Sequence, residues 1–119
     1  MYGYLREPYP CNSTKIIYKV MIHEIDNLGV YTYYYTGRDA VFSSYDSFSE
    51  NLETAMEEFE GELDDQGWIM IDDPLPYCQH DCIFPIRVKG RETGHPEWGS
   101  YEILLDGQWV EYDSTKDMP

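Results

Sequence analysis

Apolar and polar residues alternate near the start of the chain in a way that predicts a β-hairpin. Four apolar side chains recur at every second position of residues 16–24, namely Ile16, Tyr18, Val20 and Ile22. A period of two places them on one face of a strand. Residues 30–36 are rich in the β-branched and aromatic types that strands favour. The connector 25–29 has turn-forming residues and a glycine near its end, so we expect the two strands to pair antiparallel.

A helical period follows between residues 46 and 65. At about 100° per residue, these apolar side chains fall within one arc of about 100°: Phe48, Leu52, Ala55, Met56, Phe59 and Leu63. Asp46 or Ser47 is suited to cap the start of such a helix, and Gly67 is suited to end it. We therefore expect an amphipathic helix from Asp46 or Ser47 to about Asp65, with its apolar arc against a sheet.

The second half of the chain predicts short strands separated by irregular loops. The strand-like segments are 68–71, 83–89, 101–105 and 108–112. A loop with prolines, 72–82, separates the first two, and another loop, 90–99, follows them. The last two segments flank Asp106-Gly107, and an Asp-Gly pair between strand-like runs is a strong hairpin signal.

The order of these elements predicts the fold class. The order β-β-α-β-β-β-β is best satisfied by an α+β fold with one mostly antiparallel sheet and a single helix packed on one face. A length of 119 residues suits one domain, 1–119. Residues 1–14 are expected to be an N-terminal extension and 113–119 a frayed tail. The second face of the sheet, with Tyr31, Tyr33 and Tyr35 or their neighbours, is expected to be open in part.

The chain is strongly acidic, and the charge is unevenly distributed. The formal net charge is −15, from 23 acidic and 8 basic residues. Residues 39–86 hold thirteen of the carboxylates and no lysine or arginine. An aromatic content of 16% argues against a disordered acidic tail. The electrostatic field of this negative charge repels nucleic acid and anionic membranes and attracts basic proteins. We therefore expect protein partners and no direct binding of nucleic acid or membrane.

Five of these carboxylates would form a row on the predicted helix, opposite its apolar arc: Glu50, Glu53, Glu57, Glu60 and Asp64. The row would be about 21 Å long at ~1.5 Å per residue. Like charges four positions apart cost a helix a few tenths of a kcal/mol per pair. Such local costs without local benefit favour a functional surface. A solvated face that only keeps the protein soluble is the alternative interpretation.

The first functional hypothesis is a non-enzymatic acidic binding protein that neutralises or regulates a basic partner. The acidic row would be the charged contact, and Tyr31, Tyr33 and Tyr35 would be exposed anchors. Where the partner is a nucleic-acid-binding enzyme, the carboxylates would mimic phosphates. Immunity proteins against toxin nucleases and phage-encoded inhibitors of defence enzymes are physical analogies. Another hypothesis is a self-associating module that forms a homodimer through a sheet edge.

A further hypothesis is a small metal-binding or catalytic domain built on the loop 78–82. Cys78, His80 and Cys82 are ligand types that zinc favours, and Cys11 would complete a tetrahedral set. The C-x₃-C spacing has no second paired cluster, which makes this hypothesis the weaker one. The chain shows no phosphate-binding loop, nucleophile elbow or complete zinc-protease pattern. We therefore predict no cofactor and no enzymatic activity.

The lack of recognisable targeting signals and the odd number of cysteines predict a cytoplasmic location. The apolar runs are far shorter than the ~20 residues of a membrane span. The first residues lack a basic start followed by an apolar stretch, so no secretory signal is expected. Three cysteines are an odd number, which argues against a disulfide framework.

Overall fold

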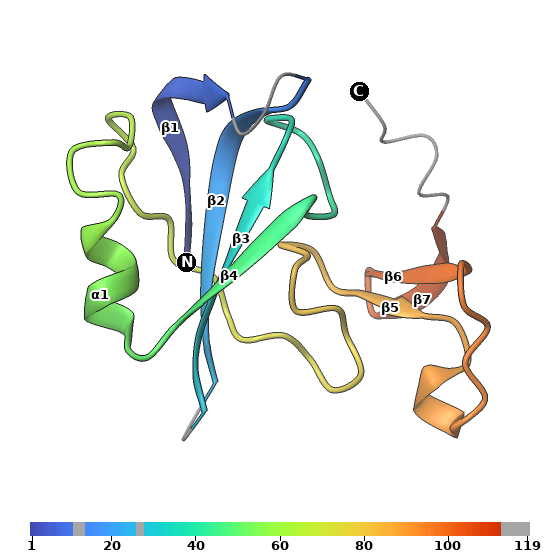
Figure 1. Ribbon diagram of the computed structural model, residues 1–119. Coiled ribbons are helices and arrows are strands. Elements are labelled where there is room, and N and C mark those ends of the chain that lie inside the picture. The colour runs from blue at the N-terminus through green and yellow to red at the C-terminus, as the bar shows by residue number, and fades with distance from the viewer. Residues whose placement is uncertain (11–13, 26–27, 113–119) are drawn as a thin grey trace.

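The computed structural model describes residues 1–10, 14–25 and 28–112, which form a sheet-dominated α+β fold (Figure 1). The elements are β1 (Tyr2–Pro10), β2 (Ile16–Ile25), β3 (Gly29–Tyr35), β4 (Tyr45–Ser49), α1 (Leu52–Glu57), β5 (Ile86–Val88), the 3-10 helix η1 (Arg91–Thr93), β6 (Tyr101–Leu105) and β7 (Gln108–Tyr112). The α+β class predicted from the sequence is therefore confirmed. The predicted frayed tail, 113–119, lies outside the described residues.

The first four strands form an antiparallel sheet in the order β1-β2-β3-β4. β2 and β3 form the predicted hairpin, in which Lys19 pairs with Tyr35 and His23 with Tyr31. Residues 1–14 were expected to be an extension, but residues 2–10 form β1, which pairs with β2. Leu5 explains this difference, because its side chain is only 2% exposed and belongs to the core of the sheet.

β4 replaces the first part of the predicted helix. A 3.6-residue period places Phe48 with the apolar arc, but its ring instead packs edge to face on Tyr31, with centroids 5.4 Å apart. Ser47 Oγ lies 3.0 Å from the hydroxyl oxygen of Tyr34 on the other side of the strand. These contacts with β3 hold the segment extended.

α1 is much shorter than predicted and covers one face of the four-stranded sheet. Its cap is Asn51, whose side-chain oxygen accepts a hydrogen bond from the Thr54 amide at 2.8 Å, and neither Asp46 nor Ser47 serves. The helix ends at Glu57, well before Gly67. Gly61 has a φ of 79°, a left-handed conformation that a right-handed helix cannot contain. Within the described residues, no helix is long and apolar enough to cross a membrane.

The four-stranded sheet is covered on both faces. On the helix face the buried core comprises Leu5, Ile17, Val20, Ile22, Val30, Ala55 and Phe59. On the other face Met21, Tyr33 and Tyr35 form a second buried cluster, against which Ala40, Ile71 and Ile83 pack. The expectation that this second face is partly open is wrong at Tyr33 and Tyr35, because residues from later in the chain cover them.

The last three strands form a second antiparallel sheet, β5-β6-β7, where a single sheet was expected. The predicted hairpin of β6 and β7 is confirmed, with φ of 51° at Asp106 and 80° at Gly107. Positive φ at both central residues is what a type I′ turn requires. Of the predicted strand 68–71, Ile69 makes an isolated bridge to Tyr2. Figure 1 shows the second sheet on the side of the four-stranded sheet away from α1.

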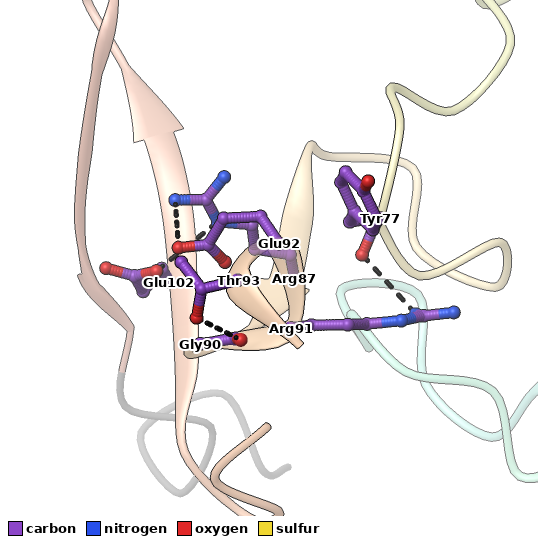
Figure 2. Close-up of polar contacts among 7 residues, drawn as sticks. All are labelled: Tyr77, Arg87, Gly90, Arg91, Glu92, Thr93 and Glu102. Carbon is purple, nitrogen blue, oxygen red and sulfur yellow. Dashed lines mark hydrogen bonds and ion pairs between the residues drawn. The ribbon is translucent and has the colours of Figure 1, made fainter. Parts of the chain in front are cut away.

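Arg87 organises the second sheet (Figure 2). Its Nε donates to Glu102 Oε1 at 3.3 Å, and its Nη2 lies 3.4 Å from Glu92 Oε1. The guanidinium also stacks 3.8 Å from the ring centroid of Trp109. Arg91 of η1 then donates to the carbonyl oxygen of Tyr77 at 3.3 Å, which ties this sheet to the preceding loop.

Candidate functional site

The five carboxylates of the predicted row do not form one continuous line. Glu53 and Glu57 lie one turn apart on α1, whereas Glu50 precedes the helix and the remaining two, Glu60 and Asp64, follow it. The main chain of Asp64 is held at the sheet edge, where its amide donates to the Tyr4 carbonyl at 2.9 Å. The prediction of a long helical row is therefore wrong, because the helix stops at Glu57.

A groove beside α1 nevertheless brings three of the five carboxylates together with apolar side chains. It has a volume of about 590 Å³ and is lined by Leu52, Glu53, Met56, Glu57, Glu60 and Trp68. We call these six residues the acidic groove. Its three apolar members pack against the core of the sheet, and the Trp68 ring lies edge to face with Phe59 at 6.1 Å. The floor is therefore anchored, while the three carboxylates are exposed.

Among the described residues, no basic side chain forms an ion pair with the carboxylates of the acidic groove. In the part of the chain that the structure describes, the ion pairs join Arg6 to Asp65 and Arg87 to Glu92 and Glu102. None of them involves Glu53, Glu57 or Glu60. Glu53 and Glu57 repel each other across one helical turn, and the last turn carries no basic residue to offset the helix dipole. The groove is thus a negative, partly apolar surface.

The three tyrosines expected to be exposed anchors differ in their burial. Tyr35 is fully buried, and its hydroxyl donates to the Asp81 carbonyl. Tyr33 is 9% exposed, and burial raises the pKa of its hydroxyl to about 12. Tyr31 is half-buried between Tyr33 and Phe48. The first two therefore stabilise the fold and offer no anchor to a partner.

Lys19 is buried on the same face of the sheet as Tyr33 and Tyr35. Its side chain is 4% exposed, and its Nζ lies 4.6 Å from the centroid of the Tyr35 ring and donates to the Ala40 carbonyl at 2.9 Å. Burial lowers the pKa of this ammonium. A lysine on the same face as Tyr33 and Tyr35 would suggest that this face is open to solvent. Because Lys19 is itself buried, its presence there does not mean that the face is open.

The loop 78–82 does not gather a metal site. Cys78 and Cys82 are buried free thiols, and burial raises the pKa of both, with the Asp81 carboxylate raising that of Cys82 further. A cysteine that binds a metal ion or acts as a nucleophile needs a lowered thiol pKa, because the thiolate is the reactive form. His80 instead packs its ring against His23. Among the described residues, no group of three His, Cys, Asp or Glu side chains could hold a metal ion, and Cys11 lies outside them.

A second hollow, not indicated by the sequence, lies between β2 and the segment 70–85. It has a volume of about 500 Å³, and we call it the histidine cleft. Its polar lining comes from His23, Glu24, Asp72, Asp73, Gln79 and His80. The rings of His23 and His80 meet edge to face with centroids 4.9 Å apart. Leu52 lines this cleft as well as the acidic groove, so the two hollows adjoin there.

The histidine cleft was missed because its two imidazoles come from distant parts of the chain. The strand period places His23 on the same face as Lys19 and Met21, but it does not reveal what lies above that face. Comparisons with protein families, with curated proteins and with solved structures found no match for this chain. A functional proposal must therefore be built on the geometry and charge of the two hollows.

Proposed function

We propose that this chain is a non-enzymatic binding protein whose acidic groove takes a basic, amphipathic segment of a partner protein. The observation that carries the proposal is an anchored apolar floor beside three exposed carboxylates that have no ion-pair partner among the described residues. Apolar side chains of the partner would contact Leu52, Met56 and Trp68. Lysine or arginine side chains of the same segment would contact the carboxylates, as in helix-in-groove recognition.

The charge of the whole chain supports the same partner chemistry. A net charge of −15 attracts a basic surface over a long range and raises the rate of encounter. The same field opposes direct contact with nucleic acid or an anionic membrane. Where the basic partner is a nucleic-acid-binding enzyme, the carboxylates take the place of phosphates and neutralise it. Pairing of two copies through a sheet edge stays a prediction, and β4 offers such an edge.

The test uses a fluorescent helical peptide of leucine and lysine, with a matched peptide in which glutamine replaces every lysine. The triple variant Glu53→Gln, Glu57→Gln, Glu60→Gln removes the charge of the groove. The triple variant Glu97→Gln, Asp106→Asn, Glu111→Gln is the control, because it changes the net charge equally at exposed sites around the second sheet. Affinity is measured by fluorescence anisotropy at low ionic strength.

We expect the groove variant to bind the lysine peptide about tenfold more weakly, since three exposed ion pairs at about 0.5 kcal/mol each amount to that factor. The control variant should change the affinity less than about twofold, because its charges act only at long range. The glutamine peptide should bind weakly to both. Equal weakening by the two triple variants would show that net charge, and not the groove, attracts the peptide.

A further inference from the structure

We propose that the histidine cleft is a binding site for a small apolar cation, an aryl or alkyl group that carries a primary ammonium. Apart from Leu52, the site is lined by other residues than the acidic groove, and the inference does not depend on the proposed function. It rests on the size of the cleft, on the exposed apolar side chains that line it and on the kind of polar groups inside it.

The size and the apolar lining of the cleft suit a small organic molecule. Its volume of about 500 Å³ lies within the range of about 300–1,000 Å³ that small-molecule sites occupy. Met21, Ile71 and Ile83 form part of its wall. Met21 belongs to the second core cluster and the two isoleucines pack against that cluster, so the wall is held by packing. A preformed wall lowers the ordering cost of binding.

Three large apolar side chains that line the cleft remain exposed to solvent. Met70 is 70% exposed, Leu75 45% and Phe84 55%, and all three line the cleft. Exposed apolar side chains that line a hollow mark a surface that a ligand covers. The covered group is therefore apolar on the side that faces these residues.

The charges around the cleft select a cation. Glu24, Asp72 and Asp73 contribute exposed carboxylates, and among the residues that the structure describes no lysine or arginine lines the cleft. The amino group of Met1 lies in the wall and donates to the Ile22 carbonyl at 3.2 Å. An anionic ligand would meet the carboxylates without a side-chain cation to offset them, whereas an ammonium is attracted.

The imidazole of His23 supplies an acceptor for an ammonium proton. Burial and the neighbouring His80 both lower the pKa of His23, which keeps its ring neutral at pH 7. Asp73 counteracts this shift, so its negative charge acts inside the cleft. A neutral imidazole has one nitrogen that accepts a hydrogen bond, and a primary ammonium has three protons to donate. His23 and Asp73 thus form a receiving set for one ammonium group, and His80 lies against the His23 ring.

The probe for this site is dansylcadaverine, a naphthalene sulfonamide with a primary ammonium, whose emission rises in an apolar environment. The matched neutral probe is its N-acetyl derivative, which has the same ring and chain without the charge. Both are titrated into the full chain at neutral pH. We expect the acetylated probe to bind at least about threefold more weakly, the effect of one exposed ion pair.

Three variants locate the binding. Asp72→Asn with Asp73→Asn should weaken the cationic probe about threefold and leave the acetylated one unchanged, whereas Phe84→Ser should weaken both. Asp106→Asn with Glu111→Gln is the matched control and should alter neither. Binding that is equal for the two probes, or that is insensitive to Asp72 and Asp73, would overturn the inference. The groove variant Glu53→Gln, Glu57→Gln, Glu60→Gln should bind the probe normally, so this test and the peptide test fail independently.

Discussion

His23 shows at the scale of one residue how burial sets charge in this fold. The folded chain holds the pKa of His23 below its ordinary value of 6.5, because burial and His80 both oppose the charged ring. The Met1 amino group acts in the same direction, and Asp73 opposes it. The unfolded chain therefore binds the His23 proton more readily than the folded chain does. The stability that His23 contributes is present above pH 6.5 and is lost as the pH falls below it.

We accordingly expect the change in unfolding temperature between pH 7 and pH 5 to be smaller in His23→Gln than in the natural sequence. His95→Gln is the control, because His95 is exposed. Thermal unfolding followed by circular dichroism at both pH values measures the difference. If His23→Gln loses as much stability on acidification as the natural sequence, His23 is not the titrating group.

The strand period could place single residues on a face, but it could not reveal their exposure. It puts Tyr31, Tyr33 and Tyr35 together correctly. Their burial depends on Ile71 and Ile83, which return to this face after the chain has completed β4 and α1. Ile71 and Ile83 lie at the end and at the start of two segments that the local pattern predicts as strands, but that pattern does not show that these segments fold back onto β2 and β3.

At the scale of the element, Asn51 sets the start of α1. Replacing it with alanine removes the acceptor for the Thr54 amide, and caps of this kind contribute about 1 kcal/mol. We expect Asn51→Ala to lower the free energy of unfolding by about that amount. Asn51→Asp should keep most of the stabilisation that the cap contributes. Urea unfolding at equal m-value measures both. An alanine variant as stable as the aspartate variant would mean that the cap contributes nothing.

The length of α1 shows where a helical period misleads. The apolar residues from Phe48 to Leu63 fit one helical arc, yet the structure divides them among β4, α1 and the turns that follow. Gly61, in its left-handed conformation, was the residue that could have shortened the prediction. The two hairpins were predictable because their turn residues and alternating strands are adjacent in the sequence.

At the scale of the whole molecule, the division into two sheets depends on contacts between distant segments. Phe42 in the loop after β3 packs on Tyr101 of β6 and on Tyr112 of β7, with ring centroids 5.0 Å and 6.3 Å apart. Neither contact has a signature in the local pattern. The uneven charge, in contrast, is visible in the sequence, although only the structure shows that Glu53, Glu57 and Glu60 share a groove with apolar side chains.

Binding of a basic amphipathic segment at the acidic groove is tested most directly by NMR. Amide chemical shifts of the labelled chain are followed while the leucine-lysine peptide is added at low salt. We predict that the largest shifts occur in residues 52–60 and at Trp68, with small ones in residues 101–112, where Glu102, Asp106 and Glu111 also carry negative charge. Shifts spread evenly over both regions, or concentrated in the second sheet, would contradict the account.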